Sequence, residues 1–470
     1  MKREQNQERP NILFIVTDHQ RADSLGMVQC GVEVTPNLNR LASQGTVFSR
    51  AYNASPICVP ARTALATGIY PTANGVVFND WKGQRAGDHQ PIHQYLSEGG
   101  YDVAHIGIDH IKVNPPIRQR VPFAKWIDNG DYAQYLANQG IDDTPPEGMD
   151  AYKRRVFEKQ DGTRVEASYS NTHVNEWPFP SEHFKDSYFC QEATEFLQTR
   201  STESPARPFA LFLYLWAPHP PLRVPEPFAS RFDPGQIELP ANVNRPAQNE
   251  PTNRREGVPA QLAADVSLDQ WRTVWAAHLG LVNLADEWIG RVLSTLESTG
   301  FNDNIVTAFM SDHGDHLGQH GLYQKMEMYE QAIRVPMVFC GPTILAQTID
   351  SPVSHLDVVP TLLDFAGIAK PHTLDGRSLF PPLVDGEHLP ATSIFCQYSG
   401  NPTVGDIRRA VITERYKYVY DPDDMAELYD LGNDPLEMEN LAADPSHHDT
   451  VQALHAQCNA WALAHNDWIT

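Results

Sequence analysis

Five short apolar runs constrain the fold of this chain more than any other feature of its sequence. Apolar side chains dominate each run, and such runs predict strands that are buried on both faces of a sheet. The runs are residues 11–16, 102–107, 209–215, 305–310 and 335–339. Amphipathic segments lie between them, most clearly 35–44 and 271–298, and these predict helices. Strands that alternate with helices predict an α/β fold, with a mostly parallel sheet flanked by helices.

Polar side chains follow four of these runs, at the point where each predicted strand ends. In chain order they are Asp18 and His19, then His110, then His219 and Arg223, then Asp312 and His313. Open α/β sheets bind ligands outside the carboxyl ends of their strands. We therefore expect these groups to converge on one crevice.

A cysteine motif, Cys58-Val59-Pro60-Ala61-Arg62, stands before a run that is compatible with a helix. Pro60 suits the first helical turn, where a missing N–H costs nothing. A helix N-terminus favours bound anions, and Arg62 returns to the same face with a fixed positive charge. The motif therefore predicts a nucleophile beside an anion site. The plainer interpretation of Cys58 is a buried structural cysteine.

The segment 58–68 resembles the maturation signature of type I sulfatases, the formylglycine-dependent branch of the alkaline phosphatase superfamily. The resemblance extends from Asn11 to about Leu441 and includes a C-terminal signature at 429–441. In that family the motif cysteine is oxidised to formylglycine, an aldehyde whose hydrate is the nucleophile. The resemblance implies that Cys58 is the formylglycine precursor and that a formylglycine-generating maturation enzyme is a partner.

The resemblance also implies one divalent metal ion. Its ligands would be Asp18, His19, Asp312, His313 and the hydrate oxygen at Cys58. In the family pattern the first strand ends in two carboxylates and the later pair is often Asp-Asn, so His19 and His313 depart from it. Added imidazole favours Mn²⁺ or another transition metal, and Ca²⁺ stays open.

Four further catalytic residues follow from the resemblance. His219 would protonate the leaving oxygen, which suits a side chain whose unperturbed pKa lies near neutrality. Lys325 would contact the sulfate and the bridging oxygen, where a cation stabilises developing charge. His110 would act as the base on the hydrate, and Arg62 would orient and charge-balance residue 58.

A second sulfatase signature, usually Gly-Lys-x-His, is Gly107-Ile108-Asp109-His110 in this chain. Ile108 replaces the lysine, so one sulfate contact is missing, and Lys112 would compensate from nearby. Asp109 is unusual beside an anion site and would recognise a cation or a hydroxyl group, unless it is a solvent-facing turn residue. We take Asp109, Lys112 and Arg223 as candidate substrate-binding residues.

The sequence thus predicts an enzyme that hydrolyses a small-molecule sulfate ester to sulfate and an alcohol. The alternative is a phosphonate monoester or phosphodiester hydrolase of the same superfamily, because such relatives carry Asp-His at the metal and lack the Gly-Lys-x-His lysine. A third hypothesis is a degenerate protein that only binds an anion, which a Cys58→Ala variant would separate from an enzyme. The alcohol, whether sugar, aryl, alkyl or choline-like, stays open.

Two domains are expected from the resemblance and from a change of pattern after Gly367. Residues 1–370 predict a catalytic α/β sulfatase domain with an alkaline-phosphatase-like mixed, mostly parallel sheet. Residues 371–470 predict a smaller C-terminal α+β subdomain packed on it. Its expected elements are antiparallel strands at 411–413, 416–420 and 427–431 and a final helix at about 450–465.

Two segments, about 112–186 and 225–258, are rich in Pro, Asn and Asp and predict long irregular insertions. We expect them to wall the pocket and set specificity, with disordered surface loops as the alternative.

Composition sets the remaining expectations. The formal net charge of −23 argues against nucleic acid or an anionic membrane surface as a partner. Residues 1–10 lack the apolar core of a signal peptide, and no run is long enough to span a bilayer. The six cysteines are scattered. We expect a cytoplasmic protein with reduced thiols, and leave homo-oligomerisation open.

Overall fold

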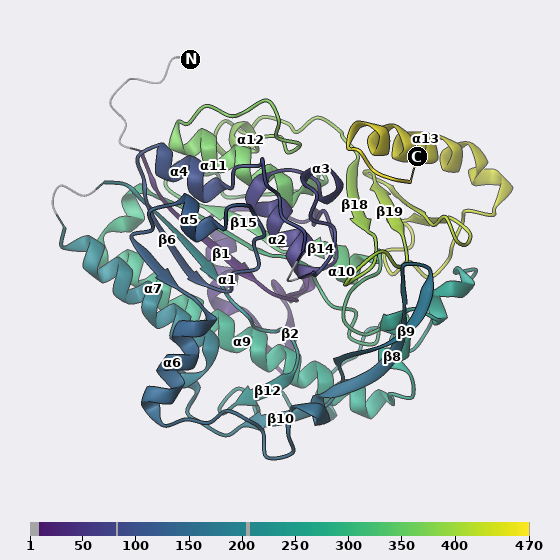
Figure 1. The fold of residues 1–470 in the computed structure, drawn as a ribbon, viewed down its shortest axis with the longest axis horizontal. Coiled ribbons are helices and arrows are strands. Elements are labelled where there is room, and N and C mark those ends of the chain that lie inside the picture. Colours follow the sequence, from purple (N-terminus) through teal and green to yellow (C-terminus); the bar gives the residue numbers. More distant parts are fainter. Residues whose placement is uncertain (1–8, 81–82, 204–206, 470) are drawn as a thin grey trace.

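The computed structural model of the protein describes residues 9–80, 83–203 and 207–469, so most of the polar start lies outside the described residues. Within these residues an eight-stranded sheet has the order β16–β4–β15–β13–β1–β11–β6–β7 (Figure 1). Its strands are β1 (Asn11–Thr17), β4 (Thr46–Phe48), β6 (Asp102–Gly107), β7 (Lys125–Ile127), β11 (Phe209–Tyr214), β13 (Ile305–Ser311), β15 (Met337–Cys340) and β16 (Gln347–Ile349). β1 pairs in parallel with both β11 and β13, and every residue of β11 and β13 is buried. The predicted mixed, mostly parallel sheet is confirmed.

The fifth apolar run is where the prediction of parallel strands is wrong. Pro336 divides it into β14 (Arg334–Val335) and β15, because proline cannot donate to a strand ladder. β15 then runs antiparallel to both β13 and β4.

Helices pack on both faces of the sheet in two groups (Figure 1). One group contains α1 (Pro36–Ser43), α7 (Lys185–Ser201) and α9 (Leu268–Thr299), and the other contains α2 (Cys58–Thr67), α4 (Ile92–Glu98) and α11 (Val358–Ala366). The long helix α9 begins at a capping box in which Ser267 and Gln270 exchange side-chain hydrogen bonds, and it ends at Gly300 with φ 77°. None of the helices in the described ranges is both long and apolar enough to cross a membrane.

The first insertion is more ordered than predicted. It contains α6 (Asn129–Gln139) and a hairpin of β8 (Lys153–Gln160) and β9 (Thr163–Ser170). The hairpin turns at Asp161 and Gly162, both at positive φ, which is the backbone that an Asp-Gly turn adopts. The expectation of an irregular segment is therefore wrong here, and the turn signal was present in the sequence.

Beyond the hairpin, β10 (Val174–Trp177) pairs in parallel with β12 (Leu222–Pro225). The second insertion is closer to its prediction, since it contains short 3₁₀ turns such as Pro234–Gln236 and Thr252–Arg255.

The C-terminal part forms its own antiparallel sheet, as predicted. It contains β18 (Ile394–Tyr398), β19 (Arg408–Ile412), β20 (Tyr416–Tyr420) and β21 (Glu427–Asp430), paired in that order. α13 (His448–Ala464) packs against β19 and β20 (Figure 1). The first of the four strands, β18, was not predicted.

Candidate active site

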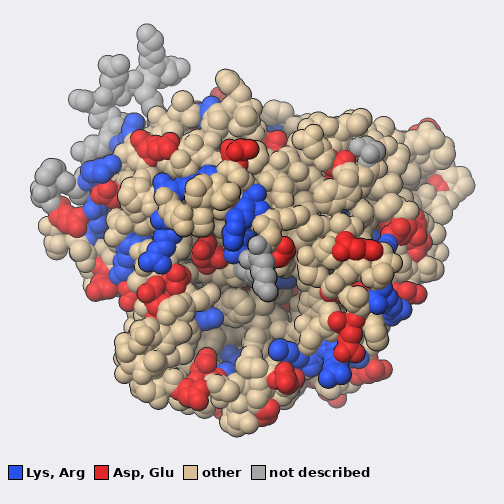
Figure 2. Space-filling view, in the orientation of Figure 1, with Lys and Arg blue, Asp and Glu red and all other residues tan. Residues whose placement is uncertain are grey.

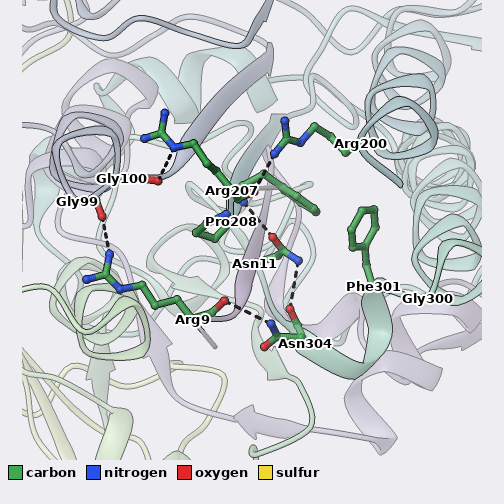
Figure 3. Close-up of a pocket in the computed structure, with 11 residues that line it drawn as sticks. Arg9, Asn11, Gly99, Gly100, Arg200, Arg207, Pro208, Gly300, Phe301 and Asn304 are labelled. Carbon is green, nitrogen blue, oxygen red and sulfur yellow. Dashed lines mark hydrogen bonds between the residues drawn. The ribbon is translucent and has the colours of Figure 1, made fainter. Parts of the chain in front are cut away.

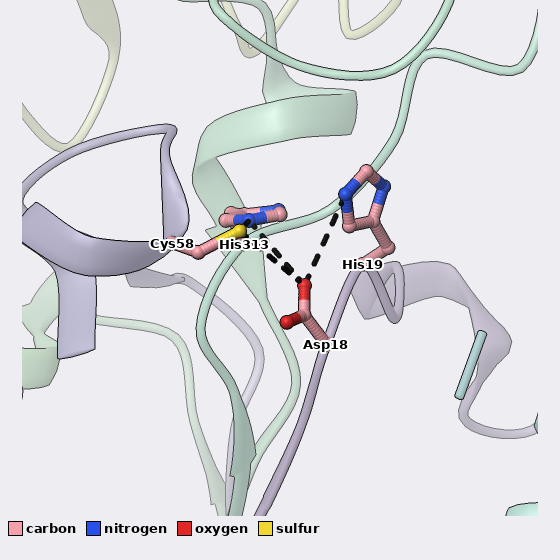
Figure 4. Close-up of side chains that lie close together, drawn as sticks. All are labelled: Asp18, His19, Cys58 and His313. Carbon is pink, nitrogen blue, oxygen red and sulfur yellow. Dashed lines mark hydrogen bonds and ion pairs between the residues drawn. The ribbon is translucent and has the colours of Figure 1, made fainter. Parts of the chain in front are cut away.

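The predicted crevice forms at the carboxyl ends of β1 and β13. Asp18 and His19 follow β1, and Asp312 and His313 follow β13. These two strands are parallel neighbours whose last residues are register partners, so the two pairs of side chains emerge side by side. All four are fully buried. Asp18, His19 and His313 lie close together with Cys58 in Figure 4, as the predicted convergence requires.

Cys58 is the first residue of α2, one position further into the helix than the sequence indicated. It is 4% exposed. Its Sγ lies 3.3 Å from Nε2 of His313 and 3.8 Å from Oδ1 of Asp18. The N–H of Val59 donates to the side chain of Asn79, which fixes the first turn of the helix. Asn79 was not singled out, because nothing in its local sequence says where its side chain points.

The imidazoles of His19 and His313 both direct Nε2 toward Asp18 and Cys58. Nδ1 of His19 lies 2.7 Å from Oδ2 of Asp315, and Nδ1 of His313 lies 3.0 Å from the carbonyl of Gly314. Donation from each Nδ1–H leaves an Nε2 lone pair facing inward, the arrangement of a metal-binding histidine. Burial holds the pKa of both imidazoles well below the usual range, so both are neutral. Asp315, which orients His19, was missed by the sequence prediction.

Four side chains could hold a metal ion. Single ligand atoms of Asp18, His19, Cys58 and His313 all lie within 4.8 Å of one another. A mixed set of carboxylate oxygen, imidazole nitrogen and sulfur suits a divalent transition metal. Asp312 stands beside this group, with its Oδ1 3.7 Å from Nε2 of His313.

The ammonium group of Lys325 lies between Sγ of Cys58 and the inward-facing Nε2 atoms of His19 and His313. Its Nζ lies 2.7 Å from Sγ of Cys58, 2.8 Å from Nε2 of His19 and 3.0 Å from Nε2 of His313. Burial lowers the pKa of Lys325, but the neighbouring Cys58, Asp18 and Asp312 outweigh it and raise the pKa overall. The ammonium is therefore charged, and the position is one that favours a cation.

The thiol of Cys58 is not activated by these neighbours. Burial raises its pKa to about 12, Asp18 adds to the increase, and Lys325 opposes it. A thiol with such a pKa carries almost no thiolate at neutral pH and is a poor nucleophile.

Arg62 binds the carboxylates of Asp18 and Asp312. Its Nε lies 2.7 Å from Oδ2 of Asp312, and its Nη2 lies 3.1 Å from Oδ2 of Asp18. Nη1 is buried and has no hydrogen-bond partner among the described residues. Burial raises the pKa of Asp18 to about 7, the charge of Asp312 adds to this, and Arg62 opposes both.

His219 and His110 border the cluster. The ring centroid of His219 lies 4.4 Å from that of His19, and its Nδ1 lies 2.5 Å from the carbonyl of Pro220. This contact leaves Nε2 of His219 as the free lone pair. Burial lowers the pKa of both His219 and His110 well below the usual range, and the pKa of His110 is lowered further by the charge of Arg62.

The three candidate substrate-binding residues lie in two places. Asp109 and Lys112 are partly buried neighbours: burial raises the pKa of Asp109 while Lys112 opposes the shift. Arg223 is on β12, and its Nη1 lies 2.5 Å from the carbonyl of Asp143 in the first insertion. Their roles toward a substrate stay predictions.

The surface is hollowed on the face seen in Figure 2, between the parts of the molecule that carry α2 and α9, with Lys and Arg side chains beside the hollow. A separate cavity of about 490 Å³ lies at the opposite edge of the sheet, where the strands begin. Arg9, Arg200 and Arg207 line it together with Asn11 and Phe301 (Figure 3).

Comparison with known proteins places this architecture. A family model described as Sulfatase matches residues 10–368, and one described as N-sulphoglucosamine sulphohydrolase, C-terminal, matches residues 318–463. An arylsulfatase of Clostridium perfringens is 27% identical over 459 residues, covering 95% of this chain and 93% of that protein. The multifunctional alkaline phosphatase superfamily protein PehA of Trinickia caryophylli is 29% identical over 502 residues, covering 98% of this chain and 96% of that protein. The structure of a phosphonate monoester hydrolase from Silicibacter pomeroyi shares the fold, with a TM-score of 0.78 at 23% sequence identity. The match covers 98% of this chain and 96% of that chain.

Proposed function

The chain belongs to the sulfatase family of sulfuric ester hydrolases, and we propose that it cleaves a sulfate ester with a formylglycine formed from Cys58. The observation that carries the proposal is the state of this cysteine. It stands at the centre of two buried imidazoles, two carboxylates and a lysine, yet burial keeps its pKa at about 12. A side chain so placed and so inert as a thiol gains a chemical role when it is converted to an aldehyde hydrate.

Asp18, His19, His313 and residue 58 would hold a divalent cation, with Asp312 alongside. The fit rests on the two Nε2 lone pairs that face inward and on the carboxylate oxygen and sulfur beside them, a donor set that suits a cation. When bound, such an ion lowers the pKa of a hydroxyl group and neutralises anionic charge. Two imidazole nitrogens in the donor set favour Mn²⁺ over Ca²⁺, which prefers oxygen.

The chain's own residues supply the remaining chemistry. The unbonded Nη1 of Arg62 is a buried donor suited to an oxygen at residue 58. A bound ester brings negative charge next to His219, which raises the proton affinity of Nε2 and allows it to protonate the departing oxygen. Lys325 stabilises the charge that develops on that oxygen. His110 is neutral and can accept the proton that residue 58 releases.

Asp109, Lys112 and Arg223 would contact the alcohol part of the substrate. Oδ1 of Asp109 is buried and has no hydrogen-bond partner within the described ranges, so a hydroxyl or a cationic group of the alcohol would satisfy it. Lys112 would supply the cation that Ile108 removes from the family pattern.

Maturation by a formylglycine-generating enzyme, and a cytoplasmic location, complete this proposal. All six cysteines are free, which suits a reducing compartment. We also retain residues 1–370 and 371–470 as a catalytic domain and a subdomain packed on it, and leave homo-oligomerisation open.

A phosphonate monoester or phosphodiester hydrolase is the second candidate function. His313 and the buried Ile108 favour it, because at these two positions the chain departs from the sulfatase pattern in the way that such hydrolases can. The fold similarity to a phosphonate monoester hydrolase fits this candidate as well.

One paired experiment decides between the two. The protein is produced with a formylglycine-generating enzyme, and peptide mass confirms the aldehyde at residue 58. The ratio kcat/KM is then measured for an aryl sulfate and for the matching aryl phosphonate monoester, with Cys58→Ala as the inactive control. A preference for sulfate supports the proposal, a preference for phosphonate overturns it, and activity that survives in Cys58→Ala shows that residue 58 is not the nucleophile.

A further inference from the structure

The chain that follows Lys325 leaves the active site through an unfavourable backbone conformation. Met326 has a φ of 79°, in the left-handed region that side chains with a Cβ avoid. Such a conformation persists only where its surroundings hold it in place. The position of the Lys325 ammonium therefore depends on what anchors the residues on either side of it.

On the N-terminal side, the anchors are hydrogen bonds. The side chain of Gln324 donates to the carbonyl of Ser170 at the end of β9, 2.6 Å away, and its N–H donates to Oδ1 of Asp315, 3.0 Å away. Directly after Lys325, the backbone N–H of Met326 donates to the carbonyl of Pro56, 3.3 Å away, just before α2.

On the C-terminal side, the anchor is a buried ion-pair bridge. Arg254 donates through Nη1 to Glu327 and through Nη2 to Glu427 on β21. Arg254 and Glu327 are 1% and 3% exposed, so the contact is shielded from water. Arg408 adds a second positive charge, with its Nε 3.8 Å from Glu327 and its Nη1 3.2 Å from Asp421.

Arg254 belongs to neither of the two parts that it joins. It lies in the 3₁₀ turn Thr252–Arg255 of the second insertion, between the segment after Lys325 and the C-terminal sheet. A planar guanidinium presents two nitrogens in a fixed fork and can bind two carboxylates at once, which an ammonium on a flexible stem does poorly. The bridge therefore requires arginine.

We propose that Arg254 is a positioning residue for Lys325. By tying Glu327 to Glu427 it holds the backbone of Met326 in its left-handed conformation, and this fixes how far the Lys325 ammonium reaches toward the ester. The proposal rests on the proposed function, because it takes Lys325 as the group that stabilises the leaving oxygen. The second insertion would thus act on catalysis through the lysine, without contact to the substrate.

The test uses Arg254→Lys, which keeps the charge but cannot bridge both carboxylates, and Glu327→Gln, which removes the ion pair from the other side. Arg409→Met is the matched control, because Arg409 is an equally buried arginine that pairs with Asp467 instead. For each mature protein, kcat/KM is measured over a series of aryl sulfates whose phenols rise in pKa. A misplaced lysine costs most where the leaving group is poor, whereas a loss of folded protein lowers every rate by the same factor.

We expect Arg254→Lys and Glu327→Gln to lose about tenfold more activity on the poorest leaving group than on the best. Arg409→Met is expected to keep the wild-type dependence on leaving-group pKa. A wild-type dependence in folded Arg254→Lys and Glu327→Gln would overturn the proposal.

A second measurement does not depend on turnover. Hydrogen exchange of the backbone amides in residues 321–330 is compared in the unconverted proteins, and we expect faster exchange in Arg254→Lys and unchanged exchange in Arg409→Met. Unchanged exchange in Arg254→Lys would overturn the proposal. If the wild-type protein cleaves no ester at all, the proposed function fails, while this exchange experiment still decides whether Arg254 anchors the segment.

Discussion

The two ends of the parallel strands in the central sheet differ in how deeply their charged side chains are buried. We call the end where these strands begin the amino edge and the end where they finish the carboxyl edge. At the amino edge, a cavity of about 490 Å³ is lined by three arginines, and Asp102 lies 3.1 Å from Arg200 and 3.2 Å from Arg207 (Figure 3). Arg9 and Arg207 donate to the backbone carbonyls of Gly99 and Gly100. Arg9 and Arg207 keep access to water, whereas Arg200 is buried and paired with Asp102.

The carboxyl edge buries its charges completely. Asp18 and Asp312 share the guanidinium of Arg62 with no exposed surface on any of the three side chains. Burial of ionisable groups is costly unless each finds a partner, so a fold that buries this many has a use for them. A cluster of buried polar and charged side chains is therefore a stronger indication of an active site than a large cavity lined by arginines.

The largest expected effect separates the edges directly. A Cys58→Ser variant produced with the same maturation enzyme lacks the cysteine from which the proposed aldehyde forms. We expect its kcat/KM to be lower than that of the wild type by about 10³-fold or more. Arg207→Gln at the amino edge, where Arg207 is exposed, is the control and should keep kcat/KM within about twofold of wild type. A large loss in folded Arg207→Gln would show that the amino edge takes part in the reaction.

Metal removal should come next in size. Dialysis against a chelator is expected to lower kcat by about 10²-fold or more, because the cationic contribution at the carboxyl edge is lost. Added Mn²⁺ should restore activity more fully than Ca²⁺. Full activity in the chelated protein, with no metal found by elemental analysis, would contradict the metal site.

Two cysteines allow the edges to be compared by reactivity. In the unconverted protein, Cys58 has a pKa raised to about 12, whereas Cys340 lies partly exposed beside a cavity of about 320 Å³ at the amino edge. Burial raises the pKa of the Cys340 thiol as well. Because Cys58 is only 4% exposed and Cys340 is partly exposed, iodoacetamide at pH 8 should label Cys340 about 10²-fold faster than Cys58. The rate at Cys58 should rise about tenfold per pH unit. Peptide mass spectrometry measures both rates.

Asp315 tests how far the carboxyl edge depends on its supporting residues. Asp315→Asn weakens the hold on His19 Nδ1, and we expect a 10- to 100-fold loss in metal affinity, as is typical of such partners. Metal titration followed by calorimetry provides the readout. An unchanged affinity would show that the negative charge of Asp315 does not support metal binding through His19.

The smallest effect is expected at the amino edge. Arg207→Gln removes an exposed ion pair with Asp102 and should lower the free energy of unfolding by at most about 1 kcal/mol. Urea unfolding measures this change, and kcat/KM should stay at the wild-type value. A larger loss of stability would mean that the amino edge is more tightly coupled to the fold than its exposure indicates.

The buried strands of the apolar runs and the polar residues at their ends were predictable from the sequence, whereas the order of the strands in the sheet was not predicted. Asp18 and Asp312 had to meet once β1 and β13 paired. The reversal of β15 was not predictable, since it depends on Pro336 and on pairing with the distant β4.

The supporting residues were harder to find. The loop after β13 turns through non-glycine residues at positive φ, namely Leu317, His320, Gln324 and Met326. Local preferences oppose such a path, so only the packed structure shows that Asp315 reaches His19 and that Glu327 reaches Arg254. The Asp-Gly turn of the β8–β9 hairpin, in contrast, is a local signal that was readable.

The burial of Cys58 limits when another enzyme can reach this residue during the synthesis of the protein. Every residue of α2 is buried, so an enzyme that must handle the segment 58–68 can reach it only before the chain closes over it. His313 follows Cys58 by 255 residues and emerges from the ribosome later by about 10 to 50 s at roughly 5–20 residues per second. If Cys58 is converted as we propose, the nascent chain has a window of about that length in which the residue is accessible to a maturation enzyme, and a Cys58 that misses it stays a buried thiol.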